Sequence, residues 1–288
     1  MRPGDRVGVA ALSGPVEADA LERGLVELRR QGYEPVVAEN LRSRRGLFAG
    51  GDDERLAAFH RLAADPTLAA VFFARGGHGV LRLLPRLDWS VLEARPRAYV
   101  GYSDTTPFLL QVVERLGLVA FHGPMVATDL ARGLGPDEAE SLRAALAGEP
   151  IAPLPLPCWL QGGEAEGPLL GGCLSLLAAT LGTPFAPALD GALLFWEDVD
   201  EPLYRLDRML THLRLSGSLT AIRGMIVGAS CCPEGGGPKW LGEMAEVVRE
   251  VPTPAAWGLP SGHRRPNLTL PLGLPARMDP RTRQLLFP

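Results

Sequence analysis

Short apolar runs alternate with amphipathic stretches along the first half of the chain. The amphipathic stretch 17–30 has helical spacing and stops at Gly32, which suits a left-handed cap. Near-continuous apolar runs are typical of strands buried on both faces of a parallel sheet. Such runs cover residues 68–74, 97–100 and 118–121, and two further strands are predicted at 6–12 and 33–38. This rhythm predicts an open parallel sheet with helices on both faces, whose functional groups gather at the carboxyl ends of the strands.

The pattern changes near residue 148, where prolines become frequent. Residues 148–168 predict a semi-rigid linker between an N-terminal α/β domain, residues 1–147, and a smaller C-terminal α/β domain, residues 169–288. In the second domain we expect strands at 192–199 and 225–229, helices at about 202–215 and 240–251, and a glycine loop at 234–238. The segment N-L-T-L-P-L-G-L-P near the end carries too many prolines for a central strand.

One uncharged segment, residues 167–189, is long enough on paper to cross a bilayer. Glycines and prolines leave only about 173–181 as uninterrupted helix, which is far short of the roughly 20 residues that a span needs. We therefore expect a buried helix there. The N-terminus has no small-residue cleavage site and is expected to form the first strand, so a cytoplasmic location is predicted.

Composition narrows the class of partner. With 29 basic and 33 acidic residues the net charge is −4, which favours small-molecule or protein partners over nucleic acid or a membrane surface. Four cysteines without C-x-x-C spacing fit a reducing compartment. We expect no metal, because H-E-x-x-H is absent and the adjacent Cys231 and Cys232 suit tetrahedral chelation poorly. We also expect no cofactor, because G-G-H-G lacks the Walker lysine and the G-x-G-x-x-G spacing.

The stretch Y-V-G-Y-S-D-T-T-P-F places Ser103 between an apolar run and a helical pattern. A serine there is often a helix cap. However, Pro107 suits the first helical position and biases Thr106 toward the extended region, so Thr106 is the better predicted cap. Ser103 then has the position of a nucleophile on a tight strand-to-helix turn, with Gly101 giving room behind it. Thr105 stands where the G-x-S-x-G signature would have its second glycine.

A nucleophilic serine needs a base and a group that orients the base. Two histidines lie within helical patterns and are expected to be fillers: His60 and His212. Three are expected on loops and are candidate bases: His78, His122 and His263. Glu197 and Asp198 end an apolar strand and are either surface caps of the next helix or charges placed in a partly buried site.

Long motifs in a fixed order resemble the L,D-carboxypeptidases, the serine peptidase family that includes the microcin C self-immunity hydrolases. They include S-G-P-V, A-R-G-G-H-G-V-L-R-L-L-P, G-Y-S-D-T-T, H-G-P-M, G-G-C-L-S-L-L, E-D-V-D-E-P-L-Y-R-L-D-R-M-L and G-L-P-S-G-H-R-R-P-N. The resemblance implies a Ser103–Glu197–His263 triad. It also implies a flavodoxin-like N-terminal domain that supplies the serine, a smaller C-terminal domain that supplies the other two residues, and an active site at their interface.

This resemblance implies acyl transfer from a peptide that ends in a D-amino acid, with murein tetrapeptide as the expected substrate. Backbone N–H groups of Gly77 and Asp104 are candidates for the oxyanion hole, although Gly76 and Gly77 could simply form a tight turn. A substrate carboxylate needs a cation, and arginine suits bidentate contact. The candidates are Arg75, Arg82 and Arg205. Each could instead form a structural ion pair, and this interpretation is favoured for Arg205.

Three departures from the family pattern bear on substrate preference. His78 replaces the tyrosine of R-G-G-Y-G, Cys173 replaces the asparagine of G-G-N-L-S, and Asp200 replaces the glycine of E-D-V-G. With Arg75, Gly76 and Arg82, His78 and Cys173 are the expected substrate-binding residues. Two alternatives stay open: an immunity-type hydrolase of peptidyl or aminoacyl nucleotides, and a non-catalytic two-domain binding protein. The family's habit implies a homodimer.

Overall fold

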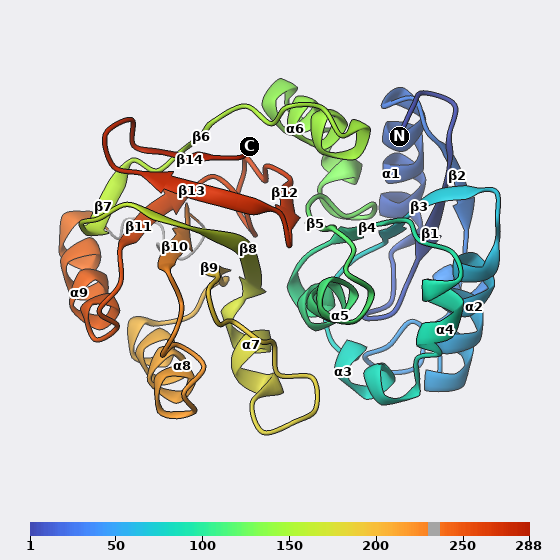
Figure 1. The fold of residues 1–288 in the computed structure, drawn as a ribbon. Helices are drawn as coiled ribbons and strands as arrows, with labels where there is room; N and C mark the ends of the chain where they lie inside the picture. Colours follow the sequence, from blue (N-terminus) through green and yellow to red (C-terminus); the bar gives the residue numbers. More distant parts are fainter. Residues whose placement is uncertain (230–236) are drawn as a thin grey trace.

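The protein consists of two lobes that lie side by side, each built around its own sheet (Figure 1). The computed structural model describes residues 1–229 and 237–288. Cys231, Cys232 and most of the glycine loop predicted at 234–238 lie outside the described residues. No helix within the described part of the chain is long and apolar enough to cross a membrane.

The first sheet confirms the predicted parallel architecture. Its strand order is β12-β5-β4-β3-β1-β2, and β1 to β5 are all parallel, as in flavodoxin-like sheets. The strands are β1 (Arg6–Ala10), β2 (Glu34–Val37), β3 (Leu68–Phe73), β4 (Ala98–Gly101) and β5 (Ala120–His122). The helices of this lobe are α1 (Ala18–Arg30), α2 (Asp52–Ala64), α3 (Val80–Leu83), α4 (Trp89–Glu93), α5 (Thr106–Leu116) and α6 (Pro136–Ala147). Short 3₁₀ turns are η1 (Glu39–Arg42), η2 (Leu84–Arg86), η3 (Ser103–Thr105) and η4 (Leu130–Arg132).

One strand of the first sheet comes from near the end of the chain. Strand β12 (Leu270–Leu272) pairs antiparallel with β5 at the sheet edge, beside the second lobe (Figure 1). Its Pro271 is tolerated because an edge strand has one side free of ladder hydrogen bonds. The expectation that this proline-rich segment avoids a central position is confirmed.

The second sheet has four parallel strands at its centre, β8 to β11, flanked by antiparallel strands. Its order within the described residues is β6-β14-β13-β8-β9-β10-β11-β7. The strands are β6 (Leu154–Pro155), β7 (Cys158–Gln161), β8 (Ala165–Cys173), β9 (Leu193–Glu197), β10 (Gly224–Gly228), β11 (Ala255–Leu259), β13 (Pro275–Asp279) and β14 (Gln284–Leu286). The helices are α7 (Leu174–Thr180), α8 (Leu203–Leu215) and α9 (Gly237–Arg249). Helix α7 occupies the position of the predicted buried helix, and it buries one face, including Leu174 and Leu177.

The segment predicted as a linker is not plain linker. Residues 148–168 contain β6, β7 and the first residues of β8. Strand β6 pairs with β14 and β7 with β11, so both find their partners far away in the sequence. The two strands form opposite edges of the second sheet, and an edge position tolerates Pro155 of β6.

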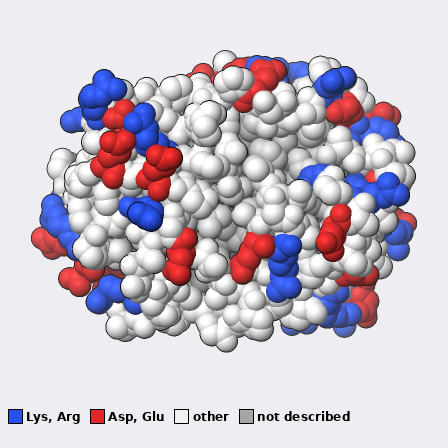
Figure 2. All heavy atoms as spheres, in the orientation of Figure 1, with Lys and Arg blue, Asp and Glu red and all other residues white. Residues whose placement is uncertain are grey.

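The two lobes share buried contacts. Helix α5, which follows β4, packs against β8 and α7 of the second lobe (Figure 1). Leu270 of β12 belongs to the same apolar cluster as Phe195 of β9. The face shown in Figure 2 carries few charged side chains along the middle, where the lobes meet. The carboxyl ends of β4, β8 and β9 are therefore held close together, which positions the candidate site.

Candidate active site

Ser103 lies directly after β4 in a strained turn. Its φ is +59°, in the left-handed region that non-glycine residues seldom adopt. The 3₁₀ turn Ser103–Thr105 leads straight into α5. A strained residue between a parallel strand and a helix is typical of a nucleophile presented at the edge of a sheet.

The prediction that Thr106 is an extended helix cap is wrong. Thr106 has helical φ and ψ of −48° and −50°, because the 3₁₀ turn continues directly into α5 and overrides the restriction from Pro107. The Thr106 hydroxyl instead accepts a hydrogen bond from the Cys173 backbone N–H at 3.1 Å. A side chain on the helix after the serine thus ties the first lobe to the end of β8.

The turn after β3 packs against Ser103. A Cβ atom on Gly76 would lie 2.8 Å from Ser103 Oγ and 3.6 Å from the backbone nitrogen of Asp104, so only glycine fits there. Gly77 has φ of +119°, which glycine adopts without strain. The turn is linked to the loop after β1 because the Gly14 N–H donates to the Gly76 carbonyl at 3.2 Å. The two segments that carry the Gly77 and Asp104 N–H groups therefore border the serine.

Glu197 and His263 form a hydrogen-bonded pair in the second lobe, in which the carboxylate is buried and the imidazole is partly exposed. Glu197 is the last residue of β9 and is fully buried. Its Oε2 lies 2.7 Å from His263 Nδ1 and accepts the His263 backbone N–H at 3.1 Å. Gly228 makes room for this carboxylate, since a Cβ there would lie 2.7 Å from the Cβ of Glu197. Contact with both the ring and the backbone of His263 fixes the imidazole orientation.

The loop that carries His263 is held by its own polar side chains. Asn267 Oδ1 accepts the Gly262 N–H at 2.9 Å, and the Ser261 hydroxyl donates to the Leu268 carbonyl at 2.8 Å. The Asn267 N–H in turn donates to Glu138 of α6 at 3.0 Å. The loop is therefore anchored to the first lobe as well as to β11.

Opposing effects set the protonation of His263. Burial favours the neutral ring, but the hydrogen bond and charge of Glu197, helped by the charges of Asp198 and Asp129, outweigh it and raise the pKa of His263. A carboxylate at Nδ1 favours the tautomer in which Nδ1 carries the proton and Nε2 is a free acceptor. This is the form that a general base requires.

Tyr102 connects the two halves of the site. It directly precedes Ser103, and its ring meets the His263 imidazole edge to face with centroids 4.9 Å apart. Its hydroxyl donates to Asp129 Oδ1 at 3.4 Å, and Asp129 Oδ2 accepts the Met125 N–H at 3.0 Å. Burial is the main cause that raises the pKa of Tyr102. The imidazole from the second lobe thus lies against the serine turn of the first.

The other two candidate bases occupy different environments. His122 is the last residue of β5 instead of a loop residue, and it is fully buried between the rings of Tyr102 and Phe195. Burial lowers the pKa of His122 to about 4, so it is neutral at pH 7. Its ring nitrogens have no hydrogen-bond partner among the described residues. His78 is exposed beside the Phe48 ring, 5.8 Å between centroids.

The expectation of a charge in a partly buried site applies to Glu197, whereas neither carboxylate is a surface cap of the next helix, because Asp198 is buried and binds α7, which comes before it in the sequence. Glu197 is the charge in the buried site, whereas Asp198 accepts the Ser175 N–H at 2.8 Å at the start of α7 and so serves as a helix cap. Cys173 lies opposite Glu197 in the β8–β9 register, and burial raises the pKa of its thiol. Asp200 has φ of +55°, a conformation that favours the glycine it replaces.

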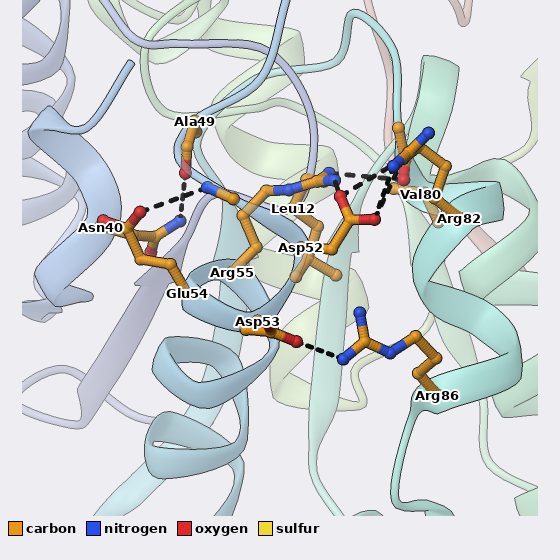
Figure 3. Close-up of polar contacts among 12 residues, drawn as sticks. Leu12, Asn40, Ala49, Asp52, Asp53, Glu54, Arg55, Val80, Arg82 and Arg86 are labelled. Carbon is orange, nitrogen blue, oxygen red and sulfur yellow. Dashed lines mark hydrogen bonds and ion pairs between the residues drawn. The ribbon is translucent and has the colours of Figure 1, made fainter. Parts of the chain in front are cut away.

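The three candidate arginines differ in their partners. Arg82 pairs with Asp52 at 2.8 Å (Figure 3), and Arg205 contacts Glu201 at 3.4 Å, as expected of a structural pair. Arg75 donates to the Pro15 carbonyl at 3.1 Å and has no ion pair with any residue in the described ranges. Its Nε would lie 3.4 Å from a Cβ on Gly14, so this guanidinium lies against the loop after β1, whose Gly14 N–H binds the Gly76 carbonyl.

Sequence reasoning did not single out Tyr102, Asp129 or Asn267. Tyr102 and Asn267 lie inside the motifs G-Y-S-D and G-H-R-R-P-N, so their position beside a candidate site residue was the available signal. Asp129 follows H-G-P-M by four residues and carried no comparable signal. Its role depends on which loop lies next to Tyr102, which only the fold determines.

Comparison with known proteins matches both lobes. The model of the LD-carboxypeptidase N-terminal domain matches residues 7–123, and that of the C-terminal domain matches residues 166–278. The murein tetrapeptide carboxypeptidase of Pseudomonas aeruginosa is 35% identical over 298 residues, covering 95% of this chain and 93% of its own.

Solved structures share the fold. Muramoyltetrapeptide carboxypeptidase from Oxalobacter formigenes has a TM-score of 0.85 at 29% identity, covering 97% of each chain. The self-immunity protein MccF in complex with glutamyl sulfamoyl guanosine has a TM-score of 0.90 at 23% identity, covering 100% of this chain and 96% of that one. This second likeness shows a common fold alone.

Proposed function

This chain belongs to the LD-carboxypeptidase family, and we propose that it is a serine carboxypeptidase with a Ser103–Glu197–His263 triad. Its reaction is hydrolysis of the L,D-peptide bond before a terminal D-amino acid, such as release of D-alanine from murein tetrapeptide. The observation that carries the proposal is the hydrogen bond of 2.7 Å between the buried Glu197 carboxylate and His263, whose imidazole lies against the residue that precedes Ser103.

The chemistry proceeds through an acyl-enzyme. Ser103 Oγ attacks the scissile carbonyl carbon while His263 Nε2 takes the hydroxyl proton. The same nitrogen then protonates the leaving amine, and the carbon–nitrogen bond breaks. A water molecule, deprotonated by His263, hydrolyses the ester and restores Ser103. Glu197 holds the ring and stabilises the imidazolium, and the Gly77 and Asp104 N–H groups stabilise the oxyanion.

Arg75 is our proposed partner for the free carboxylate of the substrate. It lies in the turn beside Ser103 and lacks an acidic partner in the part of the chain that the structure describes, unlike Arg82 and Arg205. A guanidinium without a protein carboxylate is available for bidentate contact with a ligand carboxylate. The exposed His78 and the buried Cys173 are the proposed neighbours that adjust side-chain preference.

The test is release of D-alanine from purified murein tetrapeptide by the wild type, by Ser103→Ala and by the matched control Ser90→Ala. We expect release by the wild type and the control and none by Ser103→Ala, with the fold retained. Mass spectrometry after treatment with a serine-directed electrophile should place the adduct on Ser103. Full activity of Ser103→Ala would refute the assignment.

The same assay separates the alternatives. A peptidyl-adenylate analogue is offered beside the tetrapeptide, since MccF shares the fold and binds a glutamyl sulfamoyl nucleoside. Turnover of the analogue alone would replace the carboxypeptidase with an immunity-type hydrolase. Absence of both turnover and adduct would indicate a binding protein.

A further inference from the structure

The glycine turn beside Ser103 is held by the side chain of the next residue. Asp104 is almost fully buried, and its Oδ2 accepts the Val80 N–H at 3.0 Å. Val80 begins α3 and directly follows Gly79, which has φ of +128°. Asp104, whose N–H is one proposed oxyanion donor, therefore binds through its side chain to the residue that follows the turn carrying the other donor, Gly77.

A second side chain, that of Arg55, binds the same turn at Gly79. Arg55 of α2 is fully buried, and its guanidinium donates to the Gly79 carbonyl at 3.3 Å and to the Leu12 carbonyl. Its other terminal nitrogen binds Asp52 at 2.6 Å, as Figure 3 shows. The Phe48 ring covers the guanidinium, with 4.7 Å from its central carbon to the ring centroid.

A buried guanidinium is costly unless its donors are satisfied, so this arrangement needs an explanation. The two carbonyls that Arg55 binds show which segments it connects: the turn Gly76–Gly79 and the loop after β1. Leu12 is two residues before Gly14, and the Gly14 N–H binds the Gly76 carbonyl. The turn is thus fastened at Gly76 through Gly14 in the loop after β1 and at Gly79 through Arg55, and the adjoining Val80 is held by Asp104.

We propose that Asp104, through its carboxylate, and Arg55 are positioning residues that fix the turn Gly76–Gly79 beside Ser103. The inference rests on the proposed function. Oxyanion stabilisation requires donors held in place before the reaction, and a loose shell around a site lowers its efficiency. A turn with glycines at three of its four positions has little rigidity of its own, so the two side chains supply it.

The first test compares Asp104→Ala with Asp104→Asn. Asparagine keeps a carbonyl oxygen that can accept the Val80 N–H, whereas alanine removes the acceptor. We expect Asp104→Ala to lower kcat by about 10- to 100-fold with KM within about twofold, because outright loss of an oxyanion donor costs about 10²- to 10³-fold. Asp104→Asn should recover most of the rate. Equal rates for both variants and the wild type would overturn the role of Asp104.

The second test compares Arg55→Lys with Arg86→Lys. Arg86 forms an exposed ion pair with Asp53, which lies on α2 as Arg55 does (Figure 3). Arg86→Lys is therefore a matched control. Lysine at position 55 retains the charge but cannot satisfy both carbonyls and Asp52 with a planar fork. We expect kcat to fall roughly tenfold or more for Arg55→Lys and to stay unchanged for Arg86→Lys. Rates are expressed per active site, counted by stoichiometric labelling of Ser103.

Two outcomes separate this inference from the proposed function. If wild type releases no D-alanine and no adduct forms on Ser103, the proposed function fails. If wild type is active and Arg55→Lys lowers only the thermal midpoint, with kcat per labelled site unchanged, Arg55 is structural and its positioning role is overturned. The comparison of Arg55→Lys with Arg86→Lys tests the positioning role of Arg55 even if Asp104→Ala does not fold.

Discussion

The Tyr102 ring and the His263 imidazole meet edge to face across the boundary between the lobes, with centroids 4.9 Å apart. The contact joins the residue before the proposed nucleophile to the proposed base. It restricts ring tilt, while Glu197 restricts ring rotation. Two rigid supports on one imidazole favour a single position for Nε2.

Replacing Tyr102 with leucine should slow catalysis modestly. Aromatic pairs contribute about 0.5–1.5 kcal/mol beyond area burial, so kcat is expected to fall roughly 2- to 10-fold. Tyr102→Phe keeps the ring and loses only the hydrogen bond to Asp129, and it should retain most of the rate. Steady-state kinetics on the tetrapeptide would check this, and a larger loss in the phenylalanine variant would contradict it.

Glu197→Gln should change both the rate and its pH dependence. His263 must be neutral to accept a proton, so kcat/KM rises as pH increases through a pKa that Glu197 holds above 6.5. Without that charge, burial dominates and the acid limb should move to lower pH. An amide also disfavours the required tautomer, so kcat should fall about 10³- to 10⁴-fold. An unmoved acid limb in the pH profile would count against Glu197 as the partner.

Gly76→Ala should displace the Ser103 side chain and lower kcat. The new Cβ would lie 2.8 Å from both Cβ and Oγ of Ser103, so the serine or the turn must shift. We expect at least a roughly 100-fold loss of kcat, comparable to losing an oxyanion donor. Gly162→Ala is the control, because nothing lies within 4 Å of a Cβ there. Similar kinetics for the two variants would be evidence against the close approach.

Arg75→Gln should raise KM for a tetrapeptide with a free carboxylate and leave KM for its C-terminal amide unchanged. A charge-assisted hydrogen bond contributes about 1.5–3 kcal/mol, so the expected increase is roughly 10- to 100-fold. Arg205→Gln breaks only an exposed pair with Glu201 and should behave as wild type. A KM increase in Arg205→Gln instead would reassign the carboxylate site.

His122 should make the protein less stable in mild acid. Its folded pKa is about 4, against about 6.5 when unfolded, so between these values the unfolded state binds a proton that the folded state does not. The free energy of unfolding should therefore fall as pH drops from 6.5 to 4, by up to about 3 kcal/mol. His122→Phe should lack this component. Urea unfolding at several pH values measures it, and parallel curves for the two proteins would disprove it.

The parallel strands were predictable because their signal is local. Apolar runs such as 68–74 and helical spacing such as 17–30 lie within single elements, and the structure has β3 and α1 there. Strands β6 and β7 were not predicted, and β12 was expected only as strand-and-turn material outside a central position, because the partners of all three lie far away in the sequence. Local rules describe proline as disruptive, whereas edge positions tolerate it.

The site was predictable only in part from the residues themselves. Local sequence did not distinguish among three loop histidines, or Glu197 from Asp198, and the resemblance made those choices. Burial and neighbouring strands are what separate them: His122 is enclosed at the end of β5, and Asp198 caps α7. Thr106 was misassigned because the 3₁₀ turn Ser103–Thr105 runs directly into α5 and gives Thr106 a helical backbone, which the local rule for a residue before proline does not foresee.

The path of β12 has a consequence for dissecting this protein. After His263 the chain crosses to the first sheet, pairs with β5, and returns to the second sheet as β13. A fragment of residues 1–147 would expose the edge of β5 that β12 normally covers, and a fragment of residues 148–288 would carry β12 without its partner strand. The halves matched by separate family models therefore share a sheet, and cutting the chain between them separates β12 from its only strand partner in the described structure.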